Sequence, residues 1–276
     1  MRERIEYKTP DQVRAMRRAG LVVAEIHAAL REAAAPGRTT AELDDVARGV
    51  LERAGARSNF LGYHGYPAHV CISVNDEVVH GIPGDRVLAD GDVVSFDCGA
   101  VVDGWHGDAA FTVVLGAGDP RDHALSEATR TAMWDAVAAL AGADRLDVVG
   151  AAVEDAVAAH VASGNEPLGI IEDYVGHGIG SAMHQPPDVL NYRASRRGPK
   201  LRPGMCLAIE PMLTRGTIET RVLADDWTVV TADGARAAHW EHSVAVTEHG
   251  IWVLTAEDGG AAELERRNVR VATLQL

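Results

Sequence analysis

The chain has 276 residues, of which 24% are charged and 47% hydrophobic, as in an ordinary globular protein. Its formal net charge of −14 argues against broad electrostatic binding of nucleic acid. Its three cysteines (Cys71, Cys98, Cys206) form no Cys-x-x-Cys pair, which excludes a disulfide framework and a zinc-finger pattern. The N-terminus carries repeated charges unlike a secretory signal, and no apolar run approaches the ~18 residues of a membrane span. We therefore expect a cytoplasmic protein without membrane contact.

Two helices are predicted at the start of the chain. Thr9 begins an N-terminal capping pattern with a proline next to it, and apolar residues then recur at helical spacing until the Pro-Gly pair at 36–37. Thr39 begins a second capping pattern, and this helix is expected to end near Gly55. A β-rich region follows from about 68 to 115.

The same order of elements then repeats. Helical patterns over roughly 122–141 and 146–163 precede a second β-rich region at about 174–254. The repetition predicts an α+β fold with two similar αα-plus-sheet halves, about 10–120 and 121–255, in a single domain spanning 1–276. Residues 256–276 are expected to form a loosely held C-terminal tail.

Four carboxylates and one imidazole stand out because each lies in an apolar or glycine-rich stretch. They are Asp97, Asp108, His177, Glu210 and Glu241. A buried carboxylate costs several kcal/mol unless it is paired or bound to a cation. A pair of divalent metal ions would compensate all five residues together.

The first two carboxylates can be placed by geometry. Asp103-Gly104 is a favoured two-residue hairpin turn between two β-rich runs. Without a bulge, Val102 faces Trp105 and Gly99 lies opposite Asp108. Asp97 and Asp108 then share one face as diagonal neighbours, and Gly99 leaves space beside them.

Each of these signals has a structural alternative. The aspartates could lie on a solvated sheet face, His177 could be a core or loop histidine, and Glu210 and Glu241 could be acids at strand ends. Together, however, three separate β contexts that supply carboxylates favour the functional interpretation.

The motifs also resemble a known family. They are LGYHGYPAHVCISVNDEVVHGIP, the D-x10-D of Asp97 and Asp108, GHGIGSAMHQPP, IEPM and EHSVAVT. In this order, over about 5–255, they are similar to the type I methionine aminopeptidases in their short bacterial form. The metal-binding motifs are shared with proline-specific peptidases, whereas the LGYHGYP block is more specific to the methionine aminopeptidases. The resemblance implies the pita-bread fold, with two pseudo-symmetric αα-β halves around a dinuclear site in one catalytic domain.

The resemblance also implies the roles of the metal ligands. Asp97 would chelate one ion, His177 and Glu210 would hold the other, and Asp108 and Glu241 would bridge the two. A carboxylate-rich site favours cobalt, manganese or Fe(II), with zinc as a further option. Two such ions supply a hydroxide nucleophile at neutral pH.

Further residues carry over from the family as catalytic or substrate-binding groups. His184 would stabilise the oxyanion, His80 would bond the scissile amide, and Glu210 would relay the proton. The methionine side chain would occupy a pocket that suits a thioether. This pocket would be formed by Phe60, Tyr63, Tyr66, Cys71, Met183 and Trp227, with His64 beside them. Phe60 and Met183 replace the cysteine and phenylalanine common in the family, which changes the expected pocket shape and inhibitor response.

The function implied is removal of the initiator methionine from nascent polypeptides when the second residue is small, by a monomer. A proline-type peptidase of the same fold is the alternative enzyme, and it is disfavoured by the short N-terminus. A non-catalytic binding module on this fold is the second alternative, and it is disfavoured because all five ligand positions are kept. The ribosome is a predicted partner through a basic segment formed by Arg193, Arg196, Arg197, Lys200 and Arg202, although a solvated loop is the usual explanation of such a run of charges.

Overall fold

The first half of the molecule contains two helices followed by a β-hairpin and shorter strands. The computed structural model describes residues 4–195 and 197–272. In chain order the elements are α1 (Pro10–Ala33), α2 (Thr40–Ala54), β1 (Arg57–Ser58), the 3₁₀ turn η1 (Tyr63–Gly65), β2 (Val70–Val74), β3 (Glu77–Val79), β4 (Val93–Val102) and β5 (Trp105–Val114).

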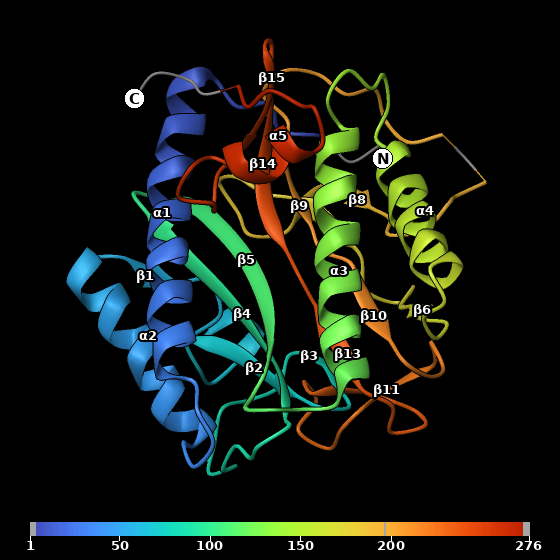
Figure 1. Cartoon of the computed structure of the whole chain (residues 1–276). Helices are drawn as coiled ribbons and strands as arrows, with labels where there is room; N and C mark the ends of the chain where they lie inside the picture. Colours follow the sequence, from blue (N-terminus) through green and yellow to red (C-terminus); the bar gives the residue numbers. More distant parts are fainter. Residues whose placement is uncertain (1–3, 196, 273–276) are drawn as a thin grey trace.

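The second half repeats the order of two helices and then strands. Its elements are α3 (Pro120–Ala139), α4 (Val148–Ala162), β6 (Gly169–Ile170), β7 (Gly176–Gly178), β8 (Gln185–Val189), β9 (Cys206–Ile209), β10 (Met212–Thr214), β11 (Thr220–Val222), β12 (Val229–Thr231), β13 (Ala237–His239), β14 (His242–Thr247), β15 (Gly250–Val253) and α5 (Ala261–Arg266). The α+β class predicted from the sequence is confirmed. Figure 1 shows α1 and α3 running beside the central strands β5 and β14.

Local sequence explains where the first two helices begin and end. Thr9 and Thr39 each accept a hydrogen bond from the backbone three residues on, and the Gln12 and Glu42 side chains bond back, so both capping patterns form as predicted. Gly55 closes α2 in the left-handed conformation, at φ 62°.

The hairpin β4–β5 has the predicted register. Val102 pairs with Trp105 and Gly99 pairs with Asp108. Asp103 and Gly104 both have positive φ, at 51° and 80°, as a two-residue turn of this kind requires. The hairpin therefore runs without a bulge through both predicted aspartates.

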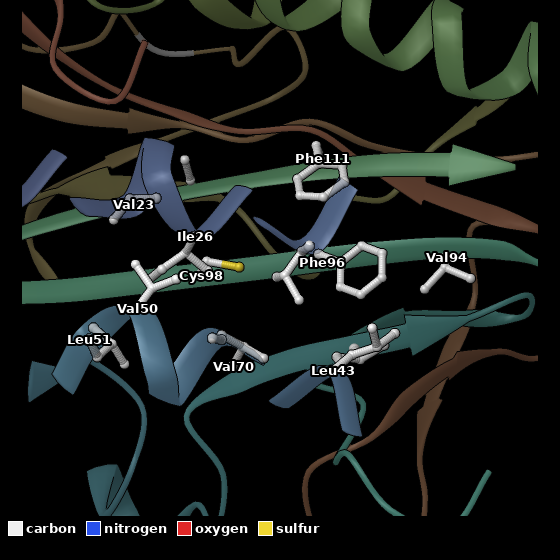
Figure 2. Close-up of a cluster of buried hydrophobic side chains, with 14 of the residues drawn as sticks. Val23, Ile26, Leu43, Val50, Leu51, Val70, Val94, Phe96, Cys98 and Phe111 are labelled. Carbon is white, nitrogen blue, oxygen red and sulfur yellow. The ribbon is translucent and has the colours of Figure 1, made fainter. Parts of the chain in front are cut away.

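The core of the first half lies between its helices and this hairpin. Side chains from α1, α2, β2, β4 and β5 meet in one buried cluster (Figure 2). Phe96 and Phe111 stack within it with ring centroids 5.1 Å apart. A second cluster packs α3 and α4 against β9, β14 and β15. Each half thus buries one face of its strands under its own helices.

Strands from the two halves also pair with each other. β3 of the first half forms a sheet with β12 and β11 of the second half, in the order β11-β12-β3. Backbone hydrogen bonds between Ala110 and Glu241 run in both directions and join β5 to the start of β14. These pairings place loops of both halves around one central region.

The C-terminal tail is packed over its described residues, 256–272, which corrects the prediction that it is loosely held. Leu264 of α5 is fully buried in the second-half core. Arg267 pairs with Asp135 of α3 at 2.6 Å, and Arg130 of α3 pairs with Glu263 at 2.5 Å. Two ion pairs and one buried leucine therefore hold α5 against α3.

In the part of the chain that the structure describes, no helix is long and apolar enough to cross a membrane.

Candidate active site

A cavity of about 280 Å³ lies where the loops of the two halves meet. The residues that line it are those that the sequence analysis singled out. They are Phe60, Tyr63, His64, Tyr66, Cys71, His80, Asp97, Asp108, His177, Met183, His184, Glu210, Trp227 and Glu241. One end of the cavity carries carboxylates and imidazoles, and the other end carries aromatic rings and sulfur.

The hairpin and its neighbour bring three carboxylates together. Asp97 lies on β4 opposite Ala110, so Asp108 on β5 is its diagonal neighbour, as predicted. Glu241 joins them because its backbone pairs with Ala110 through hydrogen bonds of 2.9 and 3.3 Å. Ser243 fixes this arrangement, since its hydroxyl donates to the Asp108 carbonyl at 2.7 Å and accepts from the Asp108 N–H.

His177 and Glu210 come from the second half. His177 lies on β7, and its Nε2 is 3.4 Å from Oε1 of Glu210, which directly follows β9. The other ring nitrogen, Nδ1, lies 3.0 Å from the Gly178 carbonyl, which can accept only. The proton of the neutral ring is therefore on Nδ1, and the Nε2 lone pair faces the carboxylates, as a metal ligand requires.

Negative charge on these buried carboxylates is disfavoured without a bound cation. Burial raises the pKa of Asp97 to about 7. Burial first, and then repulsion from Asp108, raises the pKa of Glu241 well above its usual range. Burial lowers the pKa of His177 to about 3, so this ring is neutral and compensates none of the carboxylates.

These residues fit a bound divalent cation. Oδ1 of Asp97, Oδ1 of Asp108 and Oε1 of Glu241 are buried and have no hydrogen-bond partner among the described residues. One ligand atom each from Asp108, His177 and Glu241 lie within 4.8 Å of one another. Buried oxygen atoms without a donor, clustered around an imidazole lone pair, are the donor set of a carboxylate-rich metal site.

Two further histidines face the same cavity. His184 contacts the ring of His177, with centroids 4.3 Å apart, and its Nδ1 lies 2.8 Å from the Tyr63 hydroxyl. His80 lies edge-on to Trp227 and has a φ of 61°. Positive φ is uncommon for a residue other than glycine, and such backbone strain is concentrated at functional sites.

The apolar end of the cavity is a packed cluster. Its buried members are Phe60, Tyr66, Ala68, Cys71 and Met183, with Tyr63, Ile82 and Trp227 against them. The Tyr66 ring meets Phe60 and Trp227 edge-on at 6.3 and 5.1 Å. The Tyr66 hydroxyl donates to the carbonyls of 70 and 81, which fixes its ring as a wall. His64 completes the rim and meets Tyr63 edge-on at 4.5 Å.

Two residues beside this site are not among those predicted from the sequence. His239 is 2% exposed, and its Nε2 lies 3.7 Å from Oε2 of Glu210. Its position two residues before Glu241, on a strand-like run, was a signal that could have identified it. Asn59 is 6% exposed and donates to the Gly107 carbonyl at 3.0 Å, and its amide opposes the rise in the pKa of Asp108 that burial causes. No motif marks Asn59 in the sequence.

Asn59 also corrects the prediction about Gly99. A Cβ at Gly99 would lie 2.2 Å from Nδ2 of Asn59. The space left by this glycine is thus filled by the Asn59 amide and is not open space beside the carboxylates.

A comparison with known proteins identifies the class. A family model described as metallopeptidase family M24 matches residues 14–248, and the chain belongs to this family. It is 52% identical over 252 residues to methionine aminopeptidase 1 of Mycobacterium tuberculosis, covering 91% of this chain and 95% of that protein. The crystal structure of methionine aminopeptidase from Thermotoga maritima superposes with a TM-score of 0.87 and 38% identity, over 92% of this chain and all of that one. The predicted resemblance to methionine aminopeptidases is confirmed.

The prolidase from Pyrococcus furiosus is a more distant match. Its TM-score is 0.70 at 19% identity, over 91% of this chain and 65% of that chain. This likeness shows the fold alone, which is the pita-bread fold predicted from the sequence motifs.

Proposed function

We propose that this metallopeptidase removes the N-terminal methionine from nascent polypeptides whose second residue is small. The observation that carries the proposal is the single cavity that joins a carboxylate cluster to a sulfur-lined and aromatic pocket. The identity to methionine aminopeptidases over nine-tenths of the chain supports the same activity.

The carboxylate end would hold two divalent ions. Asp97 would bind one ion, His177 and Glu210 the other, and Asp108 and Glu241 both. When bound, the ions would polarise the scissile carbonyl and make a water nucleophilic at neutral pH. The oxygen-rich donor set favours manganese, Fe(II) or cobalt over a thiolate-selected metal, with zinc less favoured. Isothermal titration of the metal-free protein with Mn²⁺ tests the stoichiometry, and one ion per chain at saturation would contradict the dinuclear arrangement.

The protein side chains would orient the substrate and stabilise charge. The methionine side chain would lie against the rings of Tyr66 and Trp227, and His80 would bond the scissile amide. The Tyr63 hydroxyl lies 2.8 Å from Nδ1 of His184, and with this hydroxyl as the donor the ring proton would be on Nε2. That N–H would donate to the carbonyl oxygen as negative charge develops on it. A Glu210 carboxylate oxygen would take the proton lost by the attacking water and return it to the leaving amine.

A peptide assay separates this activity from the two alternatives. Met-Gly-Met and an X-Pro dipeptide are incubated with the protein, each with and without a chelator. Release of methionine from Met-Gly-Met alone, abolished by the chelator and restored by Mn²⁺, is the expected result. Cleavage of the X-Pro peptide alone would indicate a proline-type peptidase, and no cleavage of either peptide would indicate a binding module.

We further propose that the basic segment contacts ribosomal RNA phosphates. Arg193, Arg197, Lys200 and Arg202 are exposed, whereas Arg196 lies outside the described residues. Arg193 is less available for binding phosphate because it forms ion pairs with Glu154 and Asp155, both at 2.5 Å. An isolated basic segment on an acidic protein would give local contact that weakens steeply as salt rises.

Ribosome co-sedimentation of wild type and an Arg196→Glu/Arg197→Glu variant tests this contact. Arg18→Glu, a charge reversal on the outside of α1, is the matched control. Loss of binding in the double variant but not in the control is expected. Equal binding by all three proteins would assign the segment to solvent.

A further inference from the structure

The segment Ala182–His184 carries two residues of the candidate site and is tied down on both sides. Met183 packs in the apolar end of the cavity and His184 faces the carboxylates. The residue before the segment, Ser181, donates to Glu6 from its hydroxyl at 2.7 Å and from its N–H at 3.2 Å. The residue after it, Gln185, accepts from Lys8 at 3.1 Å and donates to the Ser181 hydroxyl at 3.1 Å.

Lys8 is at the centre of this arrangement. Its side chain is 2% exposed, and its ammonium lies 3.2 Å from both the Glu6 carboxylate and the Glu6 carbonyl. A buried ammonium needs such partners, because an unpaired one is strongly disfavoured. Burying Lys8 at this place therefore fixes Glu6 and Gln185 together.

Two glycines leave the room that Lys8 needs. A Cβ at Gly180 would lie 2.1 Å from Cε of Lys8 and 2.3 Å from Oε2 of Glu6. A Cβ at Gly204 would lie 2.5 Å from the Lys8 carbonyl, and the Gly204 carbonyl accepts from the Lys8 N–H at 2.7 Å. The backbone on both sides is thus shaped around this lysine.

We propose that Glu6, Lys8, Ser181 and Gln185, here termed the N-terminal clasp, position His184 for the reaction. The clasp binds the two ends of the segment Ala182–His184 through Ser181 and Gln185. The Tyr63 hydroxyl contacts Nδ1 of His184 from the cavity side, at 2.8 Å. Lys8 and Glu6 are positioning residues, since they act through His184. The inference rests on the proposed function, because it assigns His184 to the scissile carbonyl.

The expected effect is on turnover more than on binding. A donor that stabilises developing charge must be placed within a few tenths of an ångström, and a displacement of about 1 Å can lower the rate by about a hundredfold. Met183 supplies one wall of a pocket with several other walls, so its displacement affects affinity less. Loosening the clasp should therefore lower kcat more than it raises KM.

The test uses Lys8→Met in the full-length enzyme, with Mn²⁺ and a Met-Gly-Met substrate. This change keeps the side-chain length and removes the ammonium. We expect kcat to fall about tenfold and KM to rise by less than about threefold. Gln185→Leu, which also removes a Lys8 partner, should act in the same direction. Gln185→Glu keeps the acceptor for Lys8 but removes the donor to Ser181, so its kcat should lie between those of Gln185→Leu and wild type.

Hydrogen exchange supplies a readout that is independent of activity. The backbone amides of 180–185 should exchange about tenfold faster in Lys8→Met than in wild type. Arg18→Met is the matched control, because Arg18 is an exposed cation on the neighbouring helix that pairs with Asp103 at 3.0 Å. It should leave both kcat and the exchange of 180–185 unchanged.

The outcomes separate the clasp from the proposed function. If wild type releases methionine but Lys8→Met does so at an unchanged kcat, the positioning role is wrong while the function stands. If exchange at 180–185 is unaffected, or Gln185→Glu fails as fully as Gln185→Leu, the positioning role is likewise wrong. If wild type releases no methionine, the proposed function itself fails.

Discussion

Replacing Asp97 by asparagine is expected to stabilise the metal-free protein while abolishing its activity. Asp97 lies in β4 with its Oδ1 unpaired among the described residues. Burial raises the pKa of this carboxyl from 3.8 to about 7, so ionised Asp97 destabilises the fold at pH 8. Asparagine has nearly the same shape and carries no charge, so the variant lacks this destabilisation.

The size of the effect follows from the pKa. Each pKa unit corresponds to about 1.4 kcal/mol, so ionised Asp97 destabilises the metal-free fold by about 4 kcal/mol at pH 8. The amide brings its own unpaired polar atoms, which cost about 1–3 kcal/mol. The net gain in unfolding free energy should therefore be about 1–3 kcal/mol, with a rise in melting temperature of about 2–4 °C per kcal/mol.

Bound metal should offset this difference in stability. Mn²⁺ at a hundred times its dissociation constant stabilises the wild type by about 2.7 kcal/mol. The variant, which lacks one ligand, should gain far less and should have no methionine-releasing activity. Thermal unfolding at pH 8, with chelator and with Mn²⁺, measures both effects.

An exposed carboxylate provides the control for this experiment. Asp45→Asn changes a residue on the surface of α2, and it should shift stability by less than about 0.5 kcal/mol in either condition. A metal-free Asp97→Asn variant that is less stable than metal-free wild type would contradict this prediction. Equal stabilisation of both proteins by Mn²⁺ would contradict it as well.

Alanine at His80 or at His184 is expected to lower kcat without changing the metal content, because neither residue is among the predicted metal ligands. Loss of metal in proportion to activity would show that these histidines are wrongly assigned to the substrate. Burial lowers the pKa of His27 well below 6.5 in the folded protein. Below pH 6.5, His27 is therefore protonated in the unfolded chain but stays neutral in the folded protein. The contribution of His27 to stability should be complete above pH 6.5 and fall by about 1.4 kcal/mol per pH unit below it. His27→Leu should remove this contribution and reduce the pH dependence by that amount in urea unfolding at pH 7 and pH 5. Arg17 donates to four backbone carbonyls between 253 and 257. Arg17→Met should therefore lower the unfolding free energy by about 3 kcal/mol and leave kcat unchanged at 25 °C. A stability equal to that of wild type would contradict the stabilising role of these hydrogen bonds.

Local patterns in the sequence were sufficient for the helices and for one hairpin. Thr9 and Thr39 start helices through bonds to residues three positions on, and Asp103-Gly104 sets a two-residue turn. These interactions span a few residues and depend little on the rest of the fold. The relation of Asp97 to Asp108 followed because strand alternation carries the register along the hairpin.

The residues of the site were also named from the sequence, by residue type and by family motif, but their arrangement was not. Glu241 reaches Asp108 through strand pairing across more than a hundred residues, and no local periodicity encodes such a contact. His239 and Asn59 were missed for the same reason, because each matters through a partner distant in the chain.

The element order, the hairpin register and the chemical types at the site thus follow from the sequence alone. Three features emerge only in the folded molecule: which distant strands pair, that Asn59 fills the space beside Gly99, and that α5 packs on α3. The burial of Lys8 next to the segment that carries His184 is a fourth such feature. Caps, turns and strand alternation act over a few residues, whereas long-range pairing and burial depend on the packing of the whole core.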